Sequence, residues 1–289
     1  MLSYRHGFHA GNPADVFKHA VLLTLIRSMQ EKPAGVTLMD THAGPARYDL
    51  GSEWALKTRE FERGVGRLWA DREEPGPLRD YLDQVARLNP AGQLRFYPGS
   101  PRLMANLMRG NDRLIACELH PAEQQGLQAE FANDRRVKVH PGDGYRTLAE
   151  QPPPSTGRGL VLIDPSYEMK DEVETMTQAL ERALRRFAHG VYLIWYPKIE
   201  GREIAIESLP ERLDLPAERW LDLFIELPAE QRMGRMWGTG MVVINPPYTL
   251  EADLAELLPW LCDTLSQSDG AGWRLDGAVA EDSLSVEEF

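Results

Sequence analysis

The sequence predicts an α/β protein built around a mostly parallel β-sheet with helices on both faces. Short apolar or β-branched runs alternate with helical patterns along the 289 residues. These runs are continuous rather than alternating in polarity, as in strands that are buried on both faces of a sheet. The apolar fraction of 43% is that of a globular protein, and the length suits one large domain or a core domain with an insertion.

Seven apolar runs are predicted to be strands: 36–40, 113–118, 136–140, 159–164, 191–195, 220–227 and 241–245. The last two have no room for a full helix between them, so we expect them to pair as an antiparallel hairpin. Five alternating units closed by a hairpin fit the seven-stranded, Rossmann-like sheet of class I methyltransferases, which use S-adenosylmethionine. They fit a plain dinucleotide-binding fold less well.

A helix over residues 12–30 is predicted before the first strand. Asn12 suits the N-cap, Pro13 suits the first helical position, and Asp15 favours the positive end of a helix. Apolar residues then recur at helical spacing: Val16, Ala20, Leu23 and Ile26.

The predicted methyltransferase core covers residues 1–51 and 98–263, and a helical insertion covers 52–97. Within the insertion, 59–69 and 77–88 are predicted to be helices, joined by a turn at 73–77. Residues 264–289 are polar and acidic, and we expect a flexible tail.

Composition limits the classes of protein. No apolar stretch is long enough to span a bilayer, and the N-terminus lacks the apolar core of a secretion signal. There are two cysteines, Cys117 and Cys262, and the apolar run around Cys117 favours a reduced core thiol. We therefore expect a cytoplasmic protein, and a monomer. The seven histidines are scattered without cysteine partners, so no metal site is expected.

The negative net charge of the chain does not exclude a nucleic-acid partner, because the charge is unevenly distributed along the sequence. The chain carries −12, but residues 250–289 hold ten acids and one base, Arg274, so the other 249 residues carry −3. Local basic faces can exist on such a body. Solvated helix faces explain the same charges, so charge alone does not establish RNA binding.

Polar residues follow four of the predicted strands, where a doubly wound sheet binds its ligands. Asp40 ends the first strand, Glu118 ends the second, Asp143 and Gly144 follow the third, and Asp164 ends the fourth. Glu118 is placed to accept hydrogen bonds from two ribose hydroxyls, and Asp143 from an adenine amine. Together these acids favour a nucleoside cofactor.

The first turn argues against a phosphate-containing cofactor. It holds Gly44 where a dinucleotide fingerprint has three glycines, and Pro45 removes an N–H that a phosphate would use. No Walker-type Gly-Lys-Ser/Thr run occurs. S-adenosylmethionine has no phosphate and does not need these features.

The run Asp164-Pro165-Ser166-Tyr167 has the features of a loop that methylates an adenine amine. The lone pair of that amine is delocalised, so a site must accept hydrogen bonds from it as the nitrogen becomes tetrahedral. A carboxylate and an adjacent carbonyl stiffened by Pro165 supply two acceptors, and Tyr167 can stack on the extruded base. An ordinary Asp-Pro turn after a strand would account for the same four residues about equally well.

A rival run, Asn245-Pro246-Pro247-Tyr248, matches the aminomethyltransferase pattern more literally. It follows the seventh strand, at the hairpin edge of the predicted sheet. Asp164 follows the fourth strand, beside the predicted cofactor site. Position therefore favours Asp164 as the catalytic residue.

Several long and unusual runs make the chain, from Met1 to about Trp260, similar to one family. They are residues 2–6, 8–12, 18–19, 40–44, 97–101, 118–121, 143–144, 164–170 and 195–197. The chain resembles the bacterial RlmJ family of 23S rRNA adenine-N6 methyltransferases. The resemblance implies a cytoplasmic enzyme that forms N6-methyladenine at one position near the peptidyl-transferase region, on naked 23S rRNA rather than on finished ribosomes.

The resemblance also implies roles for individual residues. The family's cofactor residues fall on His19, His42, Ser100, Glu118, Asp143, Gly144 and Asp164. Asp164 is also the implied catalytic acceptor, Tyr4 an implied contact of the substrate RNA, and Lys18 another. From spacing alone, His19 is more often a semi-buried helix residue. Ser166 departs from the family, whose members more often have a second proline there; we still expect activity.

Two other functions share the same residues. A DNA adenine methyltransferase would use the same chemistry but usually carries a larger basic recognition region. A non-catalytic RNA-binding module would keep the fold, although the intact Asp164 and Tyr167 argue against it. We expect the insertion to provide the RNA-binding surface, through Lys57, Arg59 and Arg63.

Overall fold

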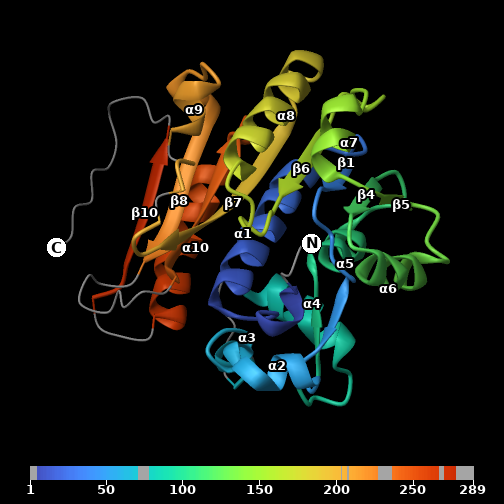
Figure 1. Ribbon diagram of the computed structural model, residues 1–289, viewed down its shortest axis with the longest axis vertical. Coiled ribbons are helices and arrows are strands. Elements are labelled where there is room, and N and C mark those ends of the chain that lie inside the picture. Colours follow the sequence, from blue (N-terminus) through green and yellow to red (C-terminus); the bar gives the residue numbers. More distant parts are fainter. Residues whose placement is uncertain are drawn as a thin grey trace.

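The centre of the protein is an eight-stranded sheet with the order β10-β8-β9-β7-β6-β1-β4-β5 (Figure 1). The computed structural model describes residues 5–70, 78–202, 204–206, 208–226, 236–266 and 270–277. The strands are β1 (Thr37–Asp40), β4 (Arg113–Glu118), β5 (Val137–Pro141), β6 (Gly159–Ile163), β7 (Val191–Ile199), β8 (Trp220–Glu226), β9 (Met236–Ile244) and β10 (Gly272–Gly277).

Strand direction agrees with the predicted fold class. β1 pairs in parallel with β4 on one side and with β6 on the other, and β5 and β7 continue the parallel part. β9 runs antiparallel to both β7 and β8, which confirms the predicted hairpin. The order reverses between β1 and β6, the point at which doubly wound sheets bind ligands.

The eighth strand corrects two expectations, the strand count and the extent of the tail. β10 lies in the segment expected to be flexible from residue 264, and it pairs with β8 so that Trp273 is opposite Ile225. The polar and acidic composition of this segment concealed the strand. Its backbone supplies hydrogen-bond partners to the otherwise open edge of β8. Residues 278–289 of the predicted tail lie outside the described residues.

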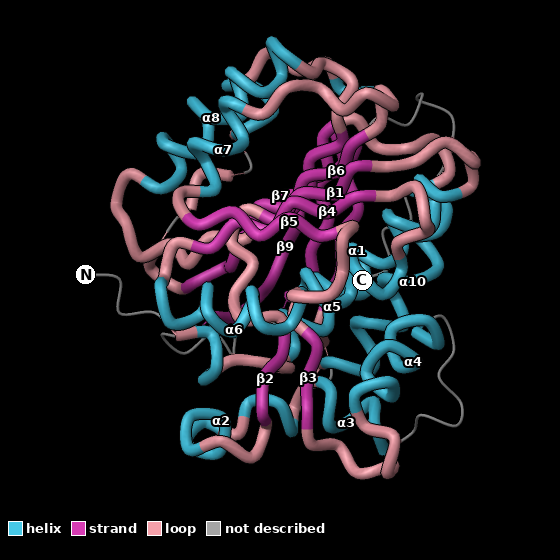
Figure 2. The backbone as a smooth tube through the Cα atoms, turned by 90° about the vertical axis from the view of Figure 1, so that its right-hand side faces the viewer, coloured by secondary structure: helices cyan, strands magenta, loops and turns pink. Residues whose placement is uncertain are grey.

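Helices cover both faces of the sheet (Figure 2). The larger core contains apolar residues of α1 (Pro13–Gln30), α5 (Ser100–Leu107), α6 (Pro121–Phe131) and α10 (Leu250–Leu265). The smaller contains those of α7 (Gly144–Glu150), α8 (Glu172–Arg186) and α9 (Leu209–Arg212). In β6, Leu160 and Leu162 join the first core while Val161 and Ile163 join the second, so this strand is apolar throughout.

The insertion after β1 contains several short helices, and a short hairpin that the sequence did not reveal closes it. The single helix expected over residues 59–69 is instead divided into a 3-10 helix and an α-helix, which are separated at Arg63 and Gly64. β2 (Arg47–Asp49) and β3 (Phe96–Pro98) form a separate two-stranded antiparallel sheet. Between them lie α2 (Glu53–Thr58), the 3-10 helix η2 (Glu60–Glu62), α3 (Val65–Ala70) and α4 (Arg79–Leu88). Their buried residues Val65, Tyr81 and Val85 belong to the same core as α1. The predicted turn at 73–77 lies outside the described residues.

Helix α1 begins as predicted and is then buried far more than its pattern indicated. The Asn12 side chain accepts a hydrogen bond from the backbone N–H of Asp15, and Pro13 occupies the first turn. The helix contacts α4, α5, α10 and β9, so its polar side is enclosed as well. Asp15, Lys18 and His19 are therefore interior residues. None of the described helices is long and apolar enough to cross a membrane.

Candidate active site

The parallel part of the sheet brings the four predicted acids to one edge. Asp40, Glu118 and Asp164 stand at or directly after the carboxyl ends of β1, β4 and β6, and Asp143 follows β5. Asp40 and Asp164 are close enough for the charge of Asp164 to raise the pKa of Asp40. Because neighbouring parallel strands end at the same edge, sequence position alone was sufficient to predict this grouping.

Asp164 forms an ion pair with Lys18, which belongs to helix α1. The Nζ of Lys18 contacts Oδ2 of Asp164 and lies 3.0 Å from Oδ1 of Asp15. The Lys18 residue is only 3% exposed. A charged group is tolerated inside a protein only when it has oppositely charged partners, and the two carboxylates meet this condition for the Lys18 ammonium.

Asp15 is the centre of this network. Besides Lys18, it contacts Nε2 of His6 at 2.8 Å and accepts a hydrogen bond from the Gly11 N–H at 2.9 Å. Burial alone would raise the pKa of Asp15, but His6 and Lys18 together hold it well below its usual value. His6 lies in the 3-10 helix η1 (His6–Phe8), so Asp15 connects the N-terminal segment, through Lys18, to the edge of the sheet that holds Asp164.

Tyr167 does not present its ring as predicted. The residue is 2% exposed, its hydroxyl donates to the backbone carbonyl of Trp195, and its backbone has a φ of +54°. The guanidinium of Arg202 donates to the Tyr167 carbonyl. In this conformation an extruded base finds no open face of Tyr167, so its stacking role stays a prediction that requires the ring to turn.

Trp195 is the aromatic residue that does lie at the Lys18–Asp164 pair. The Lys18 Nζ is 5.5 Å from the centroid of its ring, and the ring of Tyr167 is 5.9 Å away. Its indole N–H donates to the Thr239 hydroxyl at 2.8 Å. Trp195 is half-buried in β7, next to β6 in the sheet.

Asp40 is buried and has unused hydrogen-bonding capacity. Its Oδ1 accepts from the His42 N–H at 3.2 Å, whereas Oδ2 has no partner among the described residues. Burial raises the pKa of Asp40 to about 7, although the neighbouring Ser100 hydroxyl acts in the opposite direction. A buried carboxylate oxygen without a donor is costly, and a cationic ligand would satisfy it.

Glu118 connects two loops of the site. Its Oε2 accepts from the Gly44 N–H at 2.8 Å, and its Oε1 accepts from the His120 N–H at 2.6 Å. Gly44 has a φ of +60°, and a side chain there would meet the Tyr48 hydroxyl. Each carboxylate oxygen retains a further lone pair, so Glu118 can still accept hydrogen bonds from ribose hydroxyls, as predicted.

Asp143 and Gly144 form the start of α7. Asp143 caps the helix by accepting from the backbone N–H groups of Tyr145 and Arg146, and its second oxygen makes no part of that cap. Gly144 packs so closely on Thr41 that an added Cβ would lie 2.0 Å from the Thr41 carbonyl oxygen. This contact joins the loop after β5 to the loop after β1.

The two histidines lie at different depths. His19 is 2% exposed, its Nδ1 is 2.7 Å from the Tyr97 hydroxyl, and burial lowers its pKa to about 3. His42 is half-buried against Tyr145, and desolvation lowers its pKa to about 4 despite the nearby charges of Asp164 and Asp143. Both rings are therefore neutral at pH 7, and His42 faces the predicted cofactor acids.

The other predicted site residues fall in three places. Ser100 begins α5 and is buried beside Asp40, and Pro165 is buried after β6. Tyr4 lies outside the described residues. Among the residues that the structure describes, no group of three or more His, Cys, Asp or Glu side chains could hold a metal ion.

The rival run at 245–248 lies at the opposite edge of the sheet. Ile244, at the end of β9, pairs with Tyr192 at the start of β7, whereas Ile163, at the end of β6, pairs with Ile194. The side chain of Asn245 donates to the carbonyls of Ala188 and Gly190, so it stabilises a turn. The choice of Asp164 over Asn245 is thus supported by strand direction as well as by strand order.

The residues of this edge fit S-adenosylmethionine chemically. The cofactor carries a sulfonium and an ammonium cation, and the edge offers the carboxylates of Asp40, Glu118, Asp143 and Asp164. Oδ2 of Asp40, for which the described part of the chain supplies no hydrogen-bond donor, could accept from a cationic donor group. The loops after β1 and β5 touch at Gly144 and Thr41, and because residue 144 is glycine, no side chain stands between the two loops.

Three residues of the site were missed by sequence reasoning as site residues: Asp15, His6 and Trp195. Asp15 was read only as an acid at a helix start, a role that its N-terminal position also explains. Trp195 had a weak signal, because it is an aromatic residue near the end of a strand adjacent to the catalytic one. His6 had no signal other than the family resemblance.

The sequence is similar to known ribosomal RNA large subunit methyltransferases. The family model described as "Ribosomal RNA large subunit methyltransferase D, RlmJ" matches residues 33–279. Ribosomal RNA large subunit methyltransferase J of Escherichia coli K12 is 43% identical over 264 residues, which is 90% of this chain and 93% of that protein. The protein of the same name from Haemophilus influenzae is 39% identical over 97% of this chain and its own full length.

A solved structure extends the agreement to three dimensions. The crystal structure of a protein from Legionella pneumophila strain Philadelphia 1 matches with a TM-score of 0.84 and 31% identity, covering 93% of this chain and 98% of that one. The sequence and structural matches span the insertion as well as the core. This chain belongs to the RlmJ family of ribosomal RNA large subunit methyltransferases.

Proposed function

We propose that this protein transfers a methyl group from S-adenosylmethionine to the exocyclic amine of one adenine in naked 23S rRNA. The observation that carries the proposal is the position of Asp164. It follows β6 at the switch point of the sheet, beside the other three acids, and Lys18 holds it from α1. The family match supports ribosomal RNA of the large subunit as the substrate.

The residues that would hold the cofactor are those at the ends of β1, β4 and β5. Glu118 would accept from the ribose hydroxyls, Asp143 from the adenine amine, and Asp40 from the ammonium group, with His42 and Ser100 lining the same edge. When bound, S-adenosylmethionine supplies an electrophilic methyl group on a cationic sulfur. Because residue 144 is glycine, the backbone of the loop after β5 lies close to the backbone of Thr41 at this edge. His19 is buried more deeply than these residues, and in this proposal it acts indirectly, by orienting the Tyr97 hydroxyl.

The catalytic loop acts by accepting hydrogen bonds from the target amine. Lys18 contacts one oxygen of the Asp164 carboxylate, Oδ2, so Oδ1 is the oxygen directed to a substrate N–H. The carbonyl of Pro165 is the second acceptor, on a backbone stiffened by the proline ring. Two acceptors orient the amine so that its lone pair can point at the methyl donor, which is catalysis by positioning. The proton that the alkylated nitrogen loses is held at Asp164.

Trp195 forms a wall of the target-base site in this proposal. Its ring borders both Lys18 and Tyr167, so a base whose amine reaches Asp164 passes beside the indole. Base–aromatic stacking contributes about 1–3 kcal/mol per base. Lys18 thereby has two tasks, which are to orient Asp164 and to border the base.

The insertion and η1 together form the surface proposed to grip RNA. Trp54 of α2 is 41% exposed, the guanidinium of Arg5 lies 4.7 Å from its ring centroid, and Lys57 lies 5.7 Å from that of Phe8. An exposed aromatic ring such as that of Trp54, with cations nearby, suits single-stranded RNA. Arg59, expected on the same face, instead pairs with Glu62, so its charge is partly compensated.

The central test compares N6-methyladenine in rRNA from cells with and without the gene. The disappearance of one methylated adenine from 23S rRNA is the expected result, and an unchanged pattern at every rRNA adenine would refute the proposal. Parallel assays on naked 23S rRNA and duplex DNA separate it from a DNA methyltransferase. Cofactor binding without turnover on either would instead indicate a non-catalytic RNA-binding module.

A further inference from the structure

The loop from Asp164 to Tyr167 is held at both of its ends by the neighbouring structure. At its start, β6 pairs in parallel with β7, and Lys18 contacts the Asp164 carboxylate. At its end, the hydroxyl of Tyr167 donates to the Trp195 carbonyl, and the Tyr167 carbonyl accepts from the guanidinium of Arg202. Trp195 lies in β7 and Arg202 in the turn that follows it. Both anchors at the end of the loop therefore come from the segment beside the catalytic strand.

Tyr167 depends on these anchors because of its backbone conformation. Its φ of +54° lies in the left-handed region, which a residue with a large side chain seldom adopts and keeps only where the surroundings enforce it. The hydroxyl bond to Trp195 fixes the side chain, whereas the bond from Arg202 fixes the direction of the carbonyl. Without the Arg202 bond, the backbone of Tyr167 is free to return to a more common conformation.

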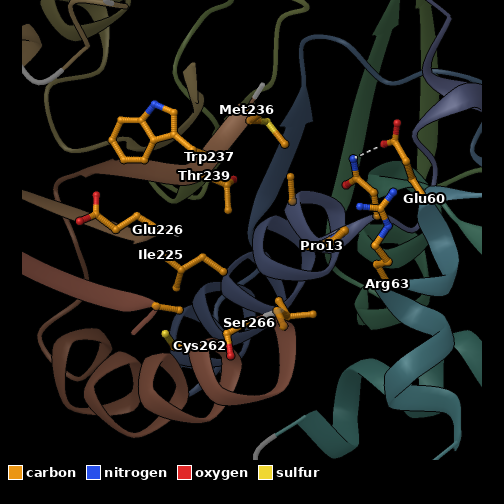
Figure 3. Close-up of a pocket in the computed structure, with 15 residues that line it drawn as sticks. Pro13, Glu60, Arg63, Ile225, Glu226, Met236, Trp237, Thr239, Cys262 and Ser266 are labelled. Carbon is orange, nitrogen blue, oxygen red and sulfur yellow. Dashed lines mark hydrogen bonds between the residues drawn. The ribbon is translucent and has the colours of Figure 1, made fainter. Parts of the chain in front are cut away.

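Both anchors are themselves fixed in place. The indole N–H of Trp195 donates to the Thr239 hydroxyl at 2.8 Å, and Thr239 lies on β9, in the wall of the pocket shown in Figure 3. The N–H of Arg202 donates to the Ile199 carbonyl at 3.2 Å and closes a tight turn. Gly201 in this turn has a φ of +70°, which glycine adopts without strain. Because β6 and β7 are parallel, the turn lies at the same edge of the sheet as the catalytic loop.

The middle of the loop is less constrained than its ends. The ring of Pro165 fixes one backbone dihedral, but Ser166 has no such ring. Within the described part of the chain, the N–H of Ser166 donates no hydrogen bond either. The peptide group between these two residues carries the Pro165 carbonyl, which the proposed function uses as the second acceptor of the target amine. The direction of that carbonyl therefore depends on where Tyr167 is held.

We infer that Arg202 is a positioning residue of the methylation reaction, which fixes the end of the catalytic loop at Tyr167 and thereby the direction of the Pro165 carbonyl. The inference rests on the proposed function. Arg202 acts through the loop and does not itself contact the methyl donor or the target amine. Its guanidinium forms no ion pair with any residue that the structure describes, and a charged donor holds a carbonyl more strongly than a neutral one.

The first experiment compares Arg202→Ala with Arg212→Ala in steady-state methylation of naked, transcribed 23S rRNA. Arg212 is the matched control, because it lies in the same connection between β7 and β8 but pairs with Glu174 of α8. We expect the kcat of Arg202→Ala to fall by on the order of 10- to 100-fold, the effect of misplacing a reacting group by about 1 Å. The KM for rRNA and the affinity for S-adenosylhomocysteine should stay unchanged in both variants.

Two further measurements separate positioning from a general loss of structure. Free guanidinium, at concentrations far below those that unfold proteins, should restore part of the kcat of Arg202→Ala. Potassium chloride at the same ionic strength is the control for this rescue. Introducing Arg202→Ala into a Ser166→Pro chain should cost less kcat than in the native chain, because the proline ring supplies part of the missing constraint.

Equal kcat for Arg202→Ala and Arg212→Ala, an absence of rescue by guanidinium, or the same loss of kcat with Ser and with Pro at position 166 would each overturn the inference. So would an unchanged kcat with a raised KM and a lower slope of rRNA affinity against salt, because Arg202 would then be a ligand of an RNA phosphate. Absence of methyl transfer by the native chain would instead overturn the proposed function.

Discussion

The ammonium group of Lys18 contacts the carboxylate of Asp164, which lies 146 positions later in the chain. The contact joins α1 to the loop after β6, and Asp15 completes it from within the helix. The contact engages one carboxylate oxygen of Asp164, Oδ2, and the proposed function assigns the other oxygen to the substrate. It also places the N-terminal helix at the proposed active site, although this helix precedes the sheet.

Asp164→Asn is expected to lower kcat on 23S rRNA by on the order of 100-fold or more. An amide has one acceptor oxygen and one donor nitrogen, so it cannot accept from Lys18 and from the target amine on separate atoms, and it cannot take up a proton. Binding of S-adenosylhomocysteine, measured by calorimetry, should remain detectable. Asn245→Ala is the comparison, because it removes a turn-forming side chain at the other edge. It should lower the melting temperature and leave kcat unchanged. Loss of activity in Asn245→Ala with retention in Asp164→Asn would reverse the assignment.

Asp15→Asn is expected to reduce both stability and turnover. The change removes the carboxylate that holds Lys18 and His6, and disrupting a buried charge network of this kind costs about 3–5 kcal/mol. Chemical denaturation measures this loss at pH 7. The folded pKa of Asp15 is lowered, so its contribution is present above the unfolded value of 3.8 and is lost as pH falls through the folded pKa. The wild type and the variant should therefore converge in strong acid; a constant difference would contradict this account.

Gly144→Ala is expected to weaken cofactor binding and to destabilise the fold by about 1–3 kcal/mol. The new Cβ would lie 2.0 Å from the Thr41 carbonyl oxygen, so the loops after β1 and β5 must separate. Gly110→Ala is the matched control, because nothing lies within 4 Å of a Cβ there. Calorimetry with S-adenosylhomocysteine and thermal unfolding report the two effects. Equal behaviour of the two variants would show that the junction is not tightly packed.

The ionisation of Asp40 predicts a pH dependence near neutrality. Its pKa is raised to about 7 from 3.8, so between these values the folded chain retains a proton that the unfolded chain has lost. Stability should therefore fall as pH rises from 4 to 7, and Asp40→Asn should remove that decline. A cationic cofactor favours the ionised form, so its affinity for the wild type should decrease below pH 7. Asp40→Asn should bind the cofactor weakly, with little change over the same range.

Lys57→Glu is expected to weaken binding of naked 23S rRNA and to lower the slope of its salt dependence, because the exposed face of α2 loses a cation. Arg185→Glu on α8 serves as the control, since its side chain is 67% exposed on a helix of the smaller core. Cofactor affinity should be the same in both variants. Equal RNA binding by the two would exclude α2 from the RNA surface.

Strand positions were predictable because a buried strand needs a continuous apolar run and a parallel sheet needs helices between its strands. β4 begins and ends where predicted, and β1 and β6 differ by one residue. Three strands escaped prediction. β2 is short and polar, β3 has only three residues and β10 is largely polar, so none has an apolar pattern long enough to reveal it. Pairing with a partner strand, rather than side-chain burial, defines them.

The sequence by itself determined the sheet order at the site, the acids at its edge and the preference for Asp164 over Asn245. Each depends on local pattern and on the rule that parallel strands end together. Only the tertiary structure decided that the polar side of α1 is interior, that Lys18 holds Asp164, and that Trp195 rather than Tyr167 borders the pair. Helical periodicity identifies an apolar face but cannot show what covers the other one. That depends on contacts with α4, α5 and α10, which are distant in sequence.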